Sequence, residues 1–130
     1  HLVGAIPPEP TRFTFITSGS PHPLPLETEL SVYRIGSELI QNVLKHAQAR
    51  RAAVQLLYHP DELLLLVEDD GLGSRVKKSD GQRAGIGLKT GSLRAEYIGA
   101  TLRREASPSG TVAVLHLPYA PAPNAPPATA

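Results

Sequence analysis

Residues 52–73 read AAVQLLYHPDELLLLVEDDGLG, and this stretch decides how the chain folds. Two apolar runs, Ala52–Tyr58 and Glu62–Glu68, are separated only by the turn-forming sequence His-Pro-Asp. Such runs with so short a separation predict a β-hairpin. The sequence then changes character, because three consecutive carboxylates precede two glycines. This polar end is either a turn that closes the strand or part of a binding site, and local chemistry alone favours the turn.

The segments around this hairpin predict a mixed α/β domain. Arg12–Thr17 alternates in polarity and predicts a strand, and Glu27–Gln48 carries apolar residues at helical spacing. A second helix is expected from near Ile86 to Gly99, followed by a hairpin of Ala100–Ala106 and Thr111–Pro118. Because the strands come in sequential pairs, we expect a mixed, largely antiparallel sheet. Helices on one face would make it a two-layer α/β sandwich.

Composition indicates one folded core with irregular ends. The chain has 130 residues, 41% of them hydrophobic, and a formal net charge of +1, which gives no reason to expect nucleic acid as a partner. We expect an N-terminal strand and linker in residues 1–25, the folded core in 26–118 and a disordered Pro/Ala-rich tail in 119–130. The absence of cysteine excludes disulfides and thiolate metal sites. With His1 first and no methionine, we expect a fragment of a longer protein.

Two polar groups of residues suggest chemistry. Glu38, Asn42 and His46 are four residues apart, which places them on one face of the expected helix. A carboxylate there can orient or deprotonate a substrate, and an amide oxygen can ligate Mg²⁺. Taken alone, such residues more often form a solvated helix face. In the sequence EDDGLG, one aspartate could accept a hydrogen bond from the amino group of a flat base such as adenine.

Two further segments could contact phosphate. The sequence GIGLKTG, residues 85–91, opens the second expected helix, whose first N–H groups could hold an anion. It is neither a P-loop nor the dinucleotide fingerprint. The preceding loop is basic, and it could be a solvated surface loop or a mobile lid over a polyphosphate. Its cations are Arg75, Lys77, Lys78 and Arg83.

In this order and spacing, the four groups resemble the ATP-binding domain of bacterial sensor histidine kinases. That domain belongs to a superfamily shared with DNA gyrase, the heat-shock chaperone ATPases and the mismatch-repair ATPases. The resemblance covers roughly residues 26–118, and VYRIGSELIQNVLKHAQA is most similar to the subgroup that includes nitrate and membrane-fluidity sensors. It implies the same mixed sheet under helices, with nucleotide between the helices and a mobile lid.

The matching residues fall into three boxes of that family. They are the N box (Glu38, Asn42, Lys45 and His46), the first glycine box (Asp69, Gly71 and Gly73) and the second glycine box (Gly85, Gly87 and Leu88). The resemblance implies that Asp69, rather than Asp70, binds the adenine amino group with support from Thr111. It also implies that Glu38 orients or activates the attacking group and that Asn42 ligates Mg²⁺. The other implied nucleotide contacts are Lys45, His46, Gly71, Gly73, Gly85, Gly87, Leu88 and Lys89.

The implied function is ATP-dependent phosphorylation of a histidine on a dimerisation domain that this chain lacks. None of the five histidines lies on an N-terminal amphipathic helix, so autophosphorylation of the isolated chain is not expected. The expected partners are ATP, that dimerisation domain and a response regulator. We expect a monomeric fragment, cytoplasmic, from a homodimeric parent that could be membrane-anchored. Two alternatives within the superfamily stay open: a serine kinase that acts as an anti-sigma factor, and an ATP-gated clamp.

Overall fold

The computed structural model describes residues 10–75 and 91–119. The elements are β1 (Arg12–Ser18), α2 (Leu26–Asn42), the π-helix η1 (Val43–Ala47), β2 (Arg51–Tyr58), β3 (Glu62–Asp69), the 3₁₀ turn η2 (Gly73–Arg75), a helix over residues 91–97, β4 (Thr101–Ser107) and β5 (Gly110–Pro118). The predicted N-terminal strand and both predicted hairpins are confirmed. The predicted start of the second helix near Ile86 lies outside the described residues.

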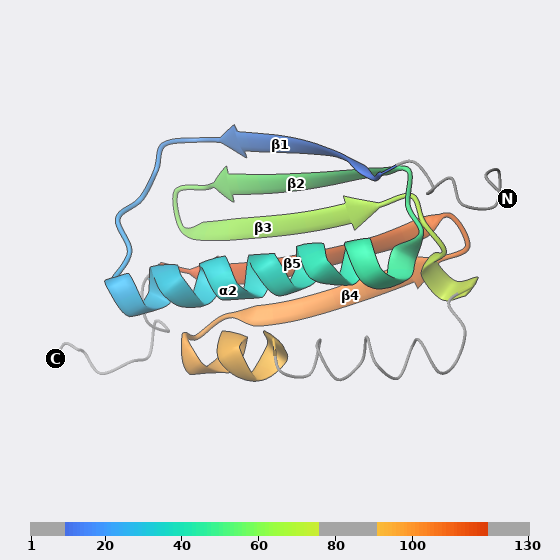
Figure 1. Ribbon diagram of the computed structural model, residues 1–130. Coiled ribbons are helices and arrows are strands. Elements are labelled where there is room, and N and C mark those ends of the chain that lie inside the picture. The colour runs from blue at the N-terminus through green and yellow to red at the C-terminus, as the bar shows by residue number, and fades with distance from the viewer. Residues whose placement is uncertain (1–9, 76–90, 120–130) are drawn as a thin grey trace, which may run out of the picture.

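The strands form one five-stranded sheet in the order β1-β2-β3-β5-β4. The edge strand β1 pairs in parallel with β2, and every other neighbouring pair is antiparallel. Figure 1 shows α2 lying over one face of the sheet and running roughly along the strands, with the helix over residues 91–97 beside β4. This is the mixed, largely antiparallel two-layer sandwich that the sequence predicts.

The core lies between α2 and the facing side of the sheet. The helix contributes apolar residues at intervals of four, and the strands β2, β3 and β5 contribute alternate residues, as the two periodicities require. The core residues that orient the site are Ile35, Leu39, Val43 and Ala47 from the helix, Leu63, Leu65 and Val67 from β3, and Ala113, Leu115 and Leu117 from β5. Continued by one more step, the same alternation brings Asp69 and Thr111 to the helix-facing side of the sheet. These two are the buried polar residues among those described.

The first helix has the predicted extent but changes type in its last turn. It is α-helical to Asn42 and continues as the π-helix η1 to Ala47, after which Gln48 adopts a left-handed conformation with φ of 52°. The Leu72 N–H donates a 2.7 Å hydrogen bond to the Ala47 carbonyl. The end of the helix is therefore attached to the loop after β3, a tertiary contact that helical periodicity does not report. Single π turns inside helices often occur at functional sites.

Replacement of Gly73 by alanine should destabilise the fold much more than the same change at Gly99. Both glycines have positive φ, 55° and 79°. A Cβ on Gly73 would lie 1.9 Å from the Ser107 carbonyl oxygen, whereas one on Gly99 would meet nothing within 4 Å. We expect Gly73→Ala to lower the free energy of unfolding by about 3 kcal/mol or more, against about 1–2 kcal/mol for Gly99→Ala. Urea denaturation measures both, and equal costs would contradict the close approach.

Candidate functional site

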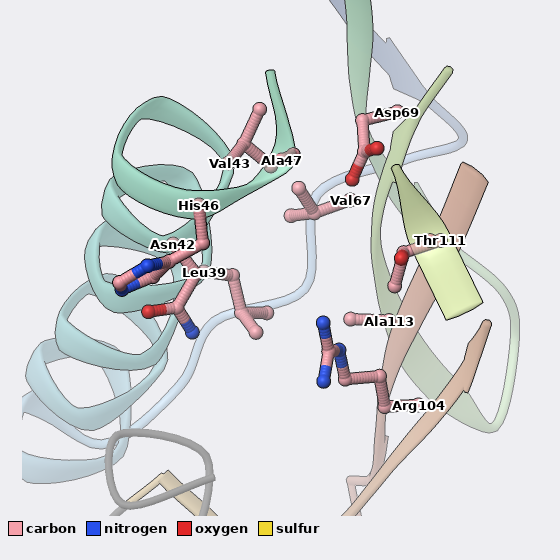
Figure 2. A pocket seen from close by; sticks show the side chains of 11 residues that line it. Leu39, Asn42, Val43, His46, Ala47, Val67, Asp69, Arg104, Thr111 and Ala113 are labelled. Atoms are coloured by element: carbon pink, nitrogen blue, oxygen red, sulfur yellow. The ribbon is translucent and has the colours of Figure 1, made fainter. Parts of the chain in front are cut away.

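A pocket opens between the end of the first helix and the sheet. Its helix side is made by residues from α2 and η1, and its sheet side by residues from β3, β4, β5 and η2 (Figure 2). The lining residues are Leu39, Asn42, Val43, His46, Ala47, Val67, Asp69, Gly73, Arg104, Thr111 and Ala113. The polar groups therefore face one another across an apolar interior, an arrangement typical of small-molecule sites.

Asp69 is the buried carboxylate of this pocket, with 8% of its surface exposed. The Gly71 N–H donates a 2.8 Å hydrogen bond to Asp69 Oδ1. No described residue makes a hydrogen bond to Oδ2, which leaves that oxygen available to a donor on a ligand. Thr111 lies directly opposite Asp69 in the β3–β5 register and is equally buried. A ligand amino group at this position would meet one carboxylate oxygen and one hydroxyl.

The electrostatic environment of Asp69 is set mainly by burial. Loss of water raises the pKa of this carboxyl, and the Gly71 N–H and the positive charge of Arg104 oppose the rise only in part. A buried carboxylate with a raised pKa gains more than an exposed one from a ligand that donates a hydrogen bond. The Asp69 carboxyl is therefore suited to bind an uncharged amino group on a flat ring that excludes water from the pocket.

The neighbouring Asp70 bonds to the backbone instead of lining the pocket. It is exposed, and its Oδ1 accepts hydrogen bonds of 2.9 Å from the N–H groups of both Arg50 and Arg51. These bonds, that from Arg51 first, hold the pKa of Asp70 below its usual value. Asp70 thus ties the end of β3 to the start of β2 and does not line the pocket. This supports the choice of Asp69 as the candidate ligand contact.

Glu38 lies one helical turn before Asn42 and outside the lining of the pocket. Its Oε2 accepts a 2.6 Å hydrogen bond from Arg94 Nη1 on the helix over residues 91–97. Its Oε1 is buried and has no hydrogen-bond partner in the part of the chain that the structure describes. The carboxylate is therefore held at one oxygen and open at the other.

The structure brings together some of the predicted contacts and not others. The pocket is lined by Asn42, His46, Asp69, Gly73 and Thr111. Gly71 supports Asp69 through its N–H group without lining the pocket. Lys45 is exposed and does not line it either. The predicted contacts that lie outside the described residues are Gly85, Gly87, Leu88 and Lys89.

Arg104 is a pocket residue that the sequence reasoning missed. Its side chain extends from β4 into the space between sheet and helix (Figure 2). Strand alternation could have identified it, because Leu102 packs on the core and the residue two positions later must face the same side of the sheet. An arginine at such an inward position should have been identified as a candidate ligand contact.

The pocket is narrow, and no metal site is built into it. The hollow measures about 30 Å³, far below the roughly 300–1,000 Å³ of typical ligand sites. Within residues 10–75 and 91–119, no three His, Asp or Glu side chains gather in a way that could hold a metal ion. No described helix has the length and apolarity to cross a membrane.

Replacement of Asp69 by asparagine should stabilise the ligand-free domain at neutral pH. Because burial raises the pKa of Asp69, the folded state retains a proton that the unfolded chain releases at lower pH. Stability is therefore lost as the pH rises from the unfolded pKa through the folded one. The asparagine in Asp69→Asn cannot ionise, so the stability advantage of this variant over the unsubstituted chain should grow with pH across this window. Urea denaturation at a series of pH values measures the difference, and a constant difference would contradict this account.

Comparison with known proteins gives concordant results for sequence and structure. Residues 27–121 match the family described as "Histidine kinase-, DNA gyrase B-, and HSP90-like ATPase". The sensor histidine kinase ComP of Bacillus subtilis is 32% identical over 84 residues, which are 65% of this chain and 11% of ComP. The sensor protein VraS of Staphylococcus epidermidis is 37% identical over 89 residues, 68% of this chain and 25% of VraS. The chain thus matches a quarter or less of the length of these relatives.

Solved structures share the fold. The histidine kinase domain of the Erythrobacter litoralis EL346 blue-light-activated histidine kinase superposes with a TM-score of 0.63 at 25% identity, over 82% of this chain and 55% of that one. The Acinetobacter baumannii histidine kinase AdeS superposes with a TM-score of 0.65 over 85% of this chain and 56% of that one. At 14% identity, AdeS supports the fold alone.

Proposed function

The chain belongs to the family of histidine kinase-, DNA gyrase B- and HSP90-like ATPases, and we propose that it is the ATP-binding catalytic domain of a sensor histidine kinase. The observation that carries the proposal is the state of Asp69. This buried carboxylate is fixed at Oδ1 by the Gly71 N–H, and no described residue bonds to Oδ2, which lies beside Thr111 and across from Asn42 and His46. Family membership and the two sensor kinases at 32% and 37% identity support the same proposal.

Nucleotide binding would use the two sides of the pocket differently. On the sheet side, Asp69 Oδ2 accepts a hydrogen bond from the adenine amino group, and Thr111 assists it. On the helix side, His46 and the exposed Lys45 interact with ribose or phosphate. The Asn42 amide oxygen would be a ligand of an Mg²⁺ ion, which prefers oxygen donors and would neutralise phosphate charge. The proposed contacts outside the described residues are Gly85, Gly87, Leu88 and Lys89.

The chemical step would be an in-line phosphoryl transfer. An imidazole nitrogen of a phosphoacceptor histidine attacks the γ-phosphorus, the bond from that phosphorus to the β,γ-bridging oxygen breaks, and ADP leaves. Glu38 accepts the proton that the imidazole releases. The protein contributes positioning and charge neutralisation, since phosphoryl transfer needs little covalent chemistry from the enzyme.

The proposal extends to parts beyond the described residues. The phosphoacceptor histidine belongs to a dimerisation domain of a homodimeric parent, and a response regulator then receives the phosphoryl group. The chain divides into an N-terminal strand and linker in residues 1–25, a core in 26–118 and a tail in 119–130. Because ATP is the phosphate donor, the domain would work in the cytoplasm, whether or not the parent is anchored in a membrane.

Titration calorimetry of this chain with Mg-ADP tests the proposal, with Mg-GDP as the matched control. Guanine carries a carbonyl oxygen where adenine carries its amino group, so Asp69 would face an acceptor instead of a donor. We expect binding of Mg-ADP only. At about 100 times the dissociation constant, Mg-ADP should stabilise the fold by roughly 2.7 kcal/mol. The absence of heat and of thermal stabilisation with either nucleotide would rule the proposal out.

A further inference from the structure

The contact between Arg94 and Glu38 joins the two helices that cover the sheet. The residues are 56 positions apart in sequence, and Arg94 Nη1 lies 2.6 Å from Glu38 Oε2. That distance is at the short end for a hydrogen bond between charged groups. Both side chains are about one-third exposed, 33% for Arg94 and 35% for Glu38. The pair lies partly inside the protein, where water screens the attraction less than at an open surface.

The unpaired oxygen of Glu38 distinguishes this contact from an ordinary salt bridge. Arginine can bind both oxygens of a carboxylate with its planar fork, but here only Oε2 is bonded. Oε1 is buried and unpartnered in the described part of the chain, which is unusual, because nearly all buried polar atoms have a partner. Gly91 lies beside it, so that a Cβ there would be 3.7 Å from Oε1. The carboxylate thus presents one shielded acceptor that nothing in the described chain uses.

We propose that Arg94 is the positioning residue for Glu38. By holding Oε2, it fixes the plane of the carboxylate and leaves Oε1 as the oxygen that accepts the imidazole proton once docking of the histidine domain uncovers it. This inference rests on the proposed function and adds to it a residue that acts through Glu38 without touching ATP. A positioned general base must lie within hydrogen-bond reach of its proton, and small displacements of such groups slow reactions strongly.

The test separates positioning from nucleotide binding. Mg-ADP and Mg-ATP affinities are measured in this chain by calorimetry, and the transfer rate at saturating ATP in the parent chain that carries the phosphoacceptor histidine. We expect Arg94→Ala to leave both affinities unchanged and to slow transfer roughly 10- to 100-fold. Arg94→Lys keeps a cationic donor and should recover part of the rate. Arg103→Ala is the control, because Arg103 on β4 lies beside Val112 and Val114 of β5 and does not line the pocket.

A double-mutant cycle with Glu38→Gln decides whether Arg94 acts through Glu38. If it does, Arg94→Ala in the Glu38→Gln background should cause little further loss of rate, and the two effects will not add. Additive effects would overturn the proposal, since Arg94 would then act independently. A weaker affinity for Mg-ATP with unchanged affinity for Mg-ADP would also overturn it, because Arg94 would then be a γ-phosphate contact.

The same measurements distinguish failure of this inference from failure of the proposed function. If Glu38→Gln transfers phosphate at the unaltered rate, the roles of Glu38 and Arg94 both fall, while Mg-ADP binding still stands as separate support for the nucleotide site. If neither nucleotide binds, the proposed function itself fails. Thermal unfolding of Arg94→Ala checks that a slow rate does not come from loss of the fold, and a partly exposed ion pair contributes little to stability.

Discussion

Asp69→Asn should lower the affinity for Mg-ADP by about 30- to 1,000-fold, a loss of about 2–4 kcal/mol. The Gly71 N–H already bonds to Asp69 Oδ1 and would keep the oxygen of an asparagine amide in that position. The amide NH₂ group would then face the pocket where Oδ2 stands now. A donor would meet the adenine amino group, so the variant loses a charged hydrogen bond and gains a repulsive contact. Calorimetry with Mg-ADP measures the change.

Asp70→Asn is the matched control, because it is the same substitution one residue further along the chain. The Asp70 side chain is exposed and bonds to the N–H groups of Arg50 and Arg51. The side-chain oxygen of an asparagine at this position can accept the same bonds, and we expect unchanged affinity for Mg-ADP. Equal losses in the two variants would refute the assignment of Asp69 to adenine, as would unchanged binding in Asp69→Asn with its fold intact.

Glu38→Gln should slow phosphoryl transfer by roughly 10²- to 10⁴-fold, the usual contribution of a general base. Glutamine has the same shape and can still accept the Arg94 hydrogen bond through its oxygen. The atom at the position of Oε1 then becomes an NH₂ group, which cannot accept the imidazole proton. Glu38 does not line the pocket, so the affinity for Mg-ADP should not change. Single-turnover transfer at saturating ATP in the parent chain measures the rate.

Glu29→Gln provides the control for this prediction. Glu29 lies on the same helix, in its first turn, and its side chain is exposed. The substitution Glu29→Gln removes the same charge at a position that contacts neither the pocket nor Arg94, so the transfer rate should not change. A loss of nucleotide binding in Glu38→Gln would contradict the assigned role, because it would make Glu38 a ligand contact.

Local sequence patterns were sufficient to predict the helices and strands and to identify candidate site residues. Strand alternation in β3 and apolar spacing in α2 are properties of neighbouring residues, so both elements could be identified before their partners were known. The spacing of the first glycine box selected Asp69 over Asp70, and in the structure Asp69 continues the buried series of Leu63, Leu65 and Val67. The N box, by contrast, was identified by its resemblance to the family, because polar residues at intervals of four are by themselves more typical of a solvated helix face.

Tertiary structure alone decided which of these faces meet. The parallel pairing of β1 with β2 and the adjacency of β3 and β5 bring segments together across long stretches of chain. The β3–β5 pairing places Thr111 opposite Asp69, and the β4–β5 pairing brings Arg104 to the same pocket. Packing of the helix over residues 91–97 beside α2 brings Arg94 to Glu38. Backbone periodicity determines the face on which a side chain lies, but the partner of that face depends on how distant elements pack. The sequence therefore specified the candidate groups, and packing between elements decided how Asp69 and Glu38 are held, each with one carboxylate oxygen bonded and the other without a partner among the described residues.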